Sequence, residues 1–128
     1  MRTSTHQHTP PISPRLSIYR WRLTMLSSIC HRASGMLLLL LIPALIWLLL
    51  TMSHNMVDFV YAMTWLHSPL GKLLVWLTCT SLLYHILNGI RFLCLDMGYG
   101  ESRVMMRLSA KLVWLATLAL AIVLAVAL

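Results

Sequence analysis

The sequence predicts an all-α membrane protein with three transmembrane helices. Apolar residues make up 59% of the 128 positions and charged residues only 10%, too few charges to solvate the surface of a water-soluble domain of this size. Three long stretches are nearly free of charge, and each approaches the roughly 20 apolar residues that cross a bilayer as a helix. Since three such helices bury little surface against one another, we expect them to pack with helices of partner subunits.

Charged residues delimit the three predicted spans, which cover about 28–52, 68–94 and 107–128. No residue between Arg32 and Asp58 carries a formal charge, and this defines the first span. The uncharged run between Lys72 and Arg91 defines the second. The third is long enough if Lys111 extends its ammonium group to the interface.

The distribution of Lys and Arg predicts the orientation. Nine of the ten basic residues precede or open the first span or flank the loop between spans two and three, and only Lys72 lies between spans one and two. Because cytoplasmic segments carry the basic excess, we expect a cytoplasmic N-terminal arm over residues 1–27 and a periplasmic C-terminus. The formal net charge of +7 therefore indicates membrane topology, and no nucleic-acid partner is expected because the basic residues sit at the ends of apolar runs.

His85 is the clearest candidate for a functional side chain within a span, where ionisable groups are costly. Helical spacing places it on one face with Thr78, Ser81 and Gly89. Such a groove of small side chains would admit a flat macrocycle coordinated by the imidazole. Equally compatible is a histidine hydrogen-bonded to a neighbouring helix, with the small residues serving helix packing.

A second candidate cluster opens the first span, where Ser28, Arg32 and Gly35 share a face and His31 lies beside them. A guanidinium group suits a carboxylate or a polarised carbonyl. The simpler alternative, which spacing alone favours, makes Arg32 a positive-inside anchor and Ser28 a helix cap. For Asp96, a proton carrier at the membrane edge and a solvated ion pair are both compatible with the sequence.

Two motifs among these residues resemble those of the succinate dehydrogenase cytochrome b subunit family. The stretch 28–35, SICHRASG, matches an S-x-x-H-R-x-[ST]-G pattern that opens the first helix of the family. The stretch from His85 to Gly98 resembles the pattern H-x-x-x-G-I-R-H-x-x-x-D-x-G, except that Phe92 stands where the family usually has histidine. The arm, the three spans and the loop lengths agree as well, so the resemblance covers essentially the whole chain.

The resemblance implies a role for each candidate. It implies that His85 is an axial ligand of the iron of a b-type haem shared with a second membrane anchor subunit, which supplies the other axial histidine. It implies that His31 and Arg32 lie close to the haem propionates. Ser28 and Arg32 are implied to bind ubiquinone near the cytoplasmic face, and Asp96 matches an acid near the quinone pocket that is a candidate for a proton path.

The implied function is that of a membrane anchor passing electrons from succinate oxidation to ubiquinone in a bacterial inner membrane. The chain has no flavin motif and no cysteine cluster, so it would not be catalytic alone but would work with flavoprotein and iron–sulfur subunits. The alternatives are the anchor subunit of a fumarate reductase and a haem-free structural anchor. A haem held by His31 and His85 together is disfavoured, because His31 is expected at a helix start and His85 deeper.

Overall fold

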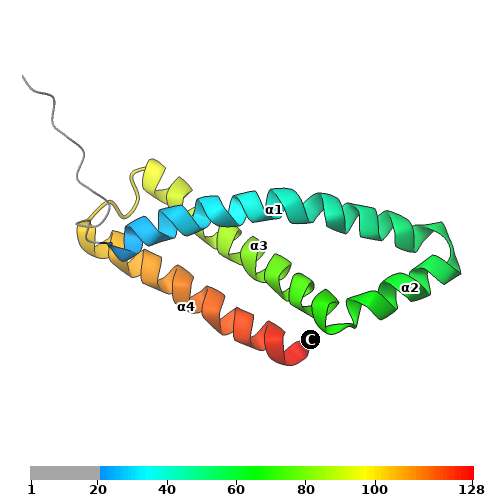
Figure 1. Ribbon diagram of the computed structural model, residues 1–128. Helices are drawn as coiled ribbons and strands as arrows, with labels where there is room; N and C mark the ends of the chain where they lie inside the picture. The colour runs from blue at the N-terminus through cyan, green and yellow to red at the C-terminus, as the bar shows by residue number, and fades with distance from the viewer. Residues whose placement is uncertain (1–20) are drawn as a thin grey trace, which may run out of the picture.

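The computed structural model describes residues 21–128, which form four helices joined by short turns (Figure 1). In chain order these are α1 (Leu23–His54), α2 (Met56–Leu66), α3 (Pro69–Asp96) and α4 (Arg103–Ala127). Helices α1, α3 and α4 are long and apolar enough to cross a membrane, which confirms the all-α fold with three predicted spans. The predicted arm over 1–27 lies mostly outside the described residues, and its last five positions already belong to α1.

Local sequence signals set where the helices begin. The Ser68 hydroxyl accepts a hydrogen bond from the backbone N–H of Gly71 at 3.2 Å, and Pro69 occupies the first position of α3, where its missing N–H costs nothing. Ser102 caps α4 in the same way. In the turn before it, Gly98 and Gly100 adopt φ values of +85° and +78°, which L side chains rarely adopt.

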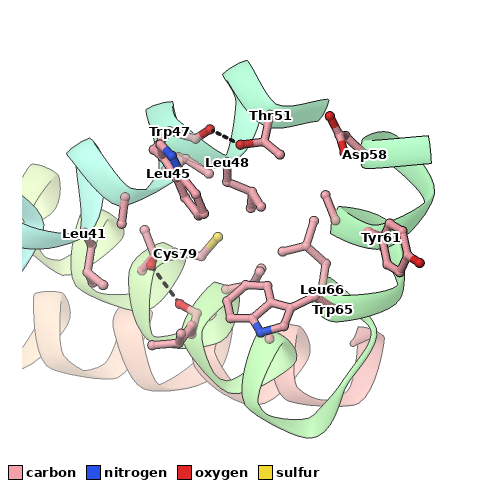
Figure 2. A pocket seen from close by; sticks show the side chains of 16 residues that line it. Leu41, Leu45, Trp47, Leu48, Thr51, Asp58, Tyr61, Trp65, Leu66 and Cys79 are labelled. Carbon is pink, nitrogen blue, oxygen red and sulfur yellow. Dashed lines mark hydrogen bonds between the residues drawn. The ribbon is translucent and has the colours of Figure 1, made fainter. Parts of the chain in front are cut away.

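Helix α2 was not predicted from the sequence. Its 11 residues are too few to span a bilayer, and they lie between the first and second predicted spans. Asn55 starts the helix by accepting a hydrogen bond from the backbone N–H of Asp58 at 2.8 Å. The helix connects the diverging ends of α1 and α3, and a cavity of about 450 Å³ lies between the three helices, lined almost entirely by apolar side chains (Figure 2).

The start of α1, the end of α3 and the start of α4 lie at one end of the molecule, and α2 and the C-terminus lie at the other (Figure 1). We call the first the basic end, because Arg22 precedes α1, Arg91 lies near the end of α3, and Arg103 and Arg107 lie in the first turns of α4. Lys72 lies at the opposite end, where its ammonium group donates to the carbonyl of Leu128. The uneven distribution of charge along the sequence is therefore also uneven in space.

Little of each span is covered by the rest of the chain. The buried positions are mostly small or polar, while large apolar side chains such as Leu39 and Leu40 are each 73% exposed. Lipid or partner helices must cover surfaces of this kind, because apolar patches of this size are not stable in water.

Candidate functional site

Ser27 joins three helices in the half of the molecule near the basic end. Its side chain is fully buried, and its carbonyl oxygen accepts hydrogen bonds from the amide of Asn88 at 2.8 Å and from the hydroxyl of Tyr84 at 3.2 Å. The Ser27 hydroxyl accepts a third, from the indole N–H of Trp114 at 3.0 Å. These bonds connect α1 with both α3 and α4, and so fix how the helices meet around the neighbouring histidines.

Arg91 extends this polar network to α4. The residue is only 7% exposed, and its guanidinium donates to the hydroxyl of Ser109 at 3.0 Å, the carbonyl of Met106 at 3.2 Å and the side-chain oxygen of Asn88 at 3.4 Å. Within residues 21–128 it forms no ion pair with Asp96, which is exposed at the end of α3. Arg91 is therefore a buried link between helices.

His31 and His85 lie face to face across the α1–α3 contact, with ring centroids 4.2 Å apart and planes inclined by 12°. Nδ1 of His85 lies 3.1 Å from the carbonyl oxygen of His31 and 3.1 Å from the hydroxyl oxygen of Ser34. The Ser34 hydroxyl donates to the same carbonyl at 2.8 Å, so its oxygen is left to act as acceptor. Both partners of Nδ1 are thus acceptors, which assigns the proton to Nδ1 and leaves the lone pair on Nε2.

The expectation that His31 lies at a helix start, shallower than His85, is wrong. Helix α1 begins at Leu23, so His31 lies about 12 Å along it, at the level of His85 on the antiparallel α3. Equal depth does not make the two histidines a pair of ligands for one macrocycle, because their rings are in contact and leave no room between them.

Two glycines border the histidine pair, and one of them, Gly35, leaves room for the His85 ring. A Cβ atom placed on Gly35 would lie 3.0 Å from Cε1 of His85, and one placed on Gly89 would lie 3.5 Å from Nε2 of His31. The predicted groove of small side chains on α3 is therefore filled at Gly89 by the imidazole of His31, and at this position the small residue serves helix packing. Nε2 of His31 is buried without a hydrogen-bond partner among the described residues.

Phe92, which departs from the family pattern, packs against His31. Their ring centroids are 5.3 Å apart and the planes are tilted by 59°. The guanidinium carbon of Arg91 lies 5.1 Å from the Phe92 ring centroid, within the range of a cation–π contact. The Phe92 ring therefore contacts both His31 and the guanidinium of Arg91.

The other predicted site residues, Ser28, Arg32 and Asp96, form no side-chain hydrogen bond or ion pair within residues 21–128. Arg32 is exposed and forms no ion pair with any residue of the described range, and Ser28 is half-buried and forms no side-chain hydrogen bond there. The alternative of Ser28 as a helix cap is wrong, because the N-cap of α1 is Arg22. No hydrogen bond connects Ser28, Arg32 or Asp96 to the histidine pair within the described residues.

The sequence comparison with known families places the chain. Residues 6–125 match the family described as the succinate dehydrogenase/fumarate reductase transmembrane subunit. The chain belongs to this family. It is 34% identical over 116 residues to the succinate dehydrogenase cytochrome b556 subunit of Coxiella burnetii, covering 90% of this chain and 92% of that protein. It is 34% identical over 90 residues to the corresponding subunit of Paracoccus denitrificans, covering 70% and 69%.

A mitochondrial relative matches as well. The succinate dehydrogenase cytochrome b560 subunit of Mus musculus is 37% identical over 94 residues, which cover 70% of this chain and 54% of the mouse protein. The family and the three apolar helices make this chain a multi-pass protein of the bacterial inner membrane, and a transmembrane subunit of this family works in association with other subunits.

The polar network around Ser27 was missed from the sequence. On α3, four polar residues are spaced at i, i+3, i+7 and i+10: Ser81, Tyr84, Asn88 and Arg91. This is the spacing of residues on one face of a helix, here the face toward a neighbouring helix. This periodicity of polar residues within an apolar span is the signal that would have found Tyr84, Asn88 and Arg91. The partner on α1 carries no such signal, because one serine among several is not distinctive.

Proposed function

We propose that this chain is the membrane anchor of a succinate dehydrogenase that binds haem b and ubiquinone and allows electrons from succinate oxidation to reach the quinone. Family membership supports the anchor role. The relatives named cytochrome b subunits support the haem. We further propose that the basic end faces the cytoplasm, with the iron–sulfur and flavoprotein subunits on that side.

The contact of Nδ1 of His85 with the His31 carbonyl is the observation that carries the haem proposal. Metal-ligating histidines usually donate the N–H of the other ring nitrogen to a carbonyl or carboxylate, which fixes the tautomer and the ring orientation. Nδ1 of His85 has such a partner in the His31 carbonyl at 3.1 Å. Nε2 forms no hydrogen bond with the described residues and is not among their fully buried unpaired atoms, so it is open to a ligand from outside the chain.

The residues present fit a b-type haem shared with a second anchor subunit. His85 would hold the iron, and because the ring of His31 stacks on that of His85, we propose that a histidine of the second anchor subunit would be the other ligand. When bound, such a haem supplies reversible one-electron transfer, and two imidazole ligands leave no open position for oxygen chemistry. Arg32 and His31 are proposed to lie toward the propionates, with Arg32 providing the charge.

Ser28 and Arg32 are proposed to bind the quinone. Both lie on α1 one turn apart, and neither is engaged within the described part of the chain. A quinone that accepts electrons gains negative charge on its oxygens, and a positioned guanidinium and hydroxyl stabilise that charge. Asp96, exposed at the membrane edge on α3, is proposed to exchange protons with water on the path to the quinone.

A reduced-minus-oxidised visible spectrum of the purified complex tests this function. A b-type haem spectrum together with succinate-dependent ubiquinone reduction is the expected result. An assembled complex without haem would support the structural anchor. A complex that reduces fumarate with quinol faster than it oxidises succinate would support the fumarate reductase anchor.

A further inference from the structure

A cleft at the basic end is lined, among the described residues, by three cationic side chains and no acid. Arg22, Leu23 and Thr24 line it from α1, and Arg107 and Lys111 line it from α4, around a volume of about 240 Å³. None of these cations forms an ion pair with a carboxylate of residues 21–128; the one pair recorded there joins His54 to Asp58 at the other end of α1. The cleft therefore gathers positive charge that this part of the chain does not neutralise.

The helix ends around the cleft add to its positive potential. Arg22 is the N-cap of α1 and forms no capping hydrogen bond with its side chain, and neither α1 nor α4 has an acid in its first turn. Arg107 and Lys111 follow the start of α4 at Arg103 by one and two turns. Since the first turn of a helix carries partial positive charge, the cation at the N-cap of α1 is unfavourable unless an anion lies nearby.

Apolar stripes run from the cleft toward the other end of the molecule. On α4, helical spacing places Leu115 and Leu118 on the face of Lys111, and these leucines are 62% and 58% exposed. On α1, Leu26 and Ile29 share the face of Arg22 and are 38% and 49% exposed. Cations at the head of two exposed apolar stripes match the two parts of a phospholipid, its charged headgroup and its acyl chains.

We propose that this cleft binds the phosphate of an anionic phospholipid, whose acyl chains lie along the stripes of α1 and α4. Basic pockets between transmembrane helices on the cytoplasmic side are suited to lipid phosphates. An acidic side chain of a soluble subunit would satisfy the cations too, but it would not cover the apolar stripes, which continue directly from the cleft. The site is independent of the haem and quinone proposals.

The test uses the whole complex, reconstituted in vesicles of phosphatidylcholine and phosphatidylglycerol in equal amounts and then extracted in mild detergent. Native mass spectrometry counts each retained lipid. Wild-type complex should retain phosphatidylglycerol preferentially, and Arg107→Gln/Lys111→Gln should retain roughly thirtyfold less, since each of the two basic residues near the membrane surface contributes about 1 kcal/mol to binding anionic lipid. Haem content and subunit composition should be unchanged.

A matched control separates the cleft from net charge. Arg103→Gln/Lys72→Gln also removes two cations, neither of which lines the cleft, and it should retain lipid as the wild type does. The swap Arg107→Lys/Lys111→Arg preserves both charges and should restore retention. Equal phosphatidylglycerol retention in the cleft variant and the wild type would overturn the proposal. Loss of a soluble subunit with lipid retention unchanged would also overturn it, and would identify the cleft as a docking site for an acidic partner.

Discussion

The imidazole of His31 lies 4.2 Å from that of His85, nearly parallel to it, while the backbone carbonyl of His31 lies 3.1 Å from Nδ1 of His85. One residue thus contacts His85 in two separate ways. The carbonyl selects the tautomer, and the side chain covers one face of the ring. Because the carbonyl belongs to the backbone, it survives any substitution of the His31 side chain that α1 tolerates.

This division of roles predicts that the two histidines differ sharply in what their loss does. His85→Ala should lower the haem content per complex severely, because it removes the proposed iron ligand. His31→Phe keeps the carbonyl and a flat ring, and it should retain most of the haem. Haem extraction and the reduced-minus-oxidised spectrum of assembled complex measure both. Full haem content in His85→Ala would refute the ligand assignment, and complete loss in His31→Phe would show that the His31 side chain is essential.

Alanine substitutions at the two glycines beside the histidine pair should differ in their effect on the haem. The Cβ of Gly35→Ala would lie 3.0 Å from Cε1 of His85, so the ring must shift. Strain of this kind costs about 1–3 kcal/mol, and here it should appear as a changed haem spectrum and weaker haem retention. Gly89→Ala is the matched control, since its Cβ would make an ordinary contact of 3.5 Å with His31. Identical spectra for both variants and the wild type would mean that the position of the His85 ring is not critical.

How much of the fold could be predicted from the sequence depends on whether a feature is set by local composition or by contacts between distant residues. The three spans follow from interruptions of charge, which depend only on local composition. Their ends were less accurate, because a span is defined by the membrane while a helix continues through the interface; α1 begins at Leu23, five residues before the predicted span. Helix α2 was not predicted because its 11 residues are as short as a loop, while its apolar composition is that of an incomplete span.

For the site, the sequence identified side chains but not their contacts. His85 was predictable because an ionisable residue within a span is rare. The contact between Ser27 and Asn88 was not, because it joins residues 61 positions apart and depends on how α1 and α3 are aligned. The same alignment puts His31 at the level of His85, which spacing within each helix could not reveal.

The orientation can be tested through the C-terminus. Since nine of ten basic residues flank the predicted cytoplasmic side, a tag fused after Leu128 should be accessible to a membrane-impermeant label only from the periplasm. Inverted membrane vesicles, which expose the cytoplasmic face, should leave it unlabelled. The same tag on the loop between α3 and α4 is the control and should show the opposite pattern. Labelling of the C-terminal tag from the cytoplasmic face would reverse the proposed topology.

The last prediction concerns Ser28 and Arg32, which the fold leaves unengaged within the described part of the chain. If Arg32 stabilises charge developing on the quinone, its removal affects turnover as well as binding. A charged hydrogen bond contributes about 1.5–3 kcal/mol, so Arg32→Leu should lower quinone reduction roughly tenfold to a hundredfold. Succinate oxidation with an artificial acceptor that bypasses the quinone should survive, and Ser28→Ala should show the same pattern more mildly.

Ser27 provides the matched control for this experiment. Ser27→Ala removes the hydroxyl next to Ser28 in sequence, which accepts a hydrogen bond from Trp114 inside the helix contact. The substitution should therefore lower the free energy of unfolding by about 0.6–1.7 kcal/mol. Its ratio of quinone-linked to bypass activity should stay at the wild-type value, whereas Ser28→Ala should lower the ratio and leave stability unchanged. A wild-type ratio in both Ser28→Ala and Arg32→Leu would assign these residues to anchoring at the membrane surface. The reason is that removing a group that touches the quinone must change the rate of quinone reduction, the step that the artificial acceptor bypasses.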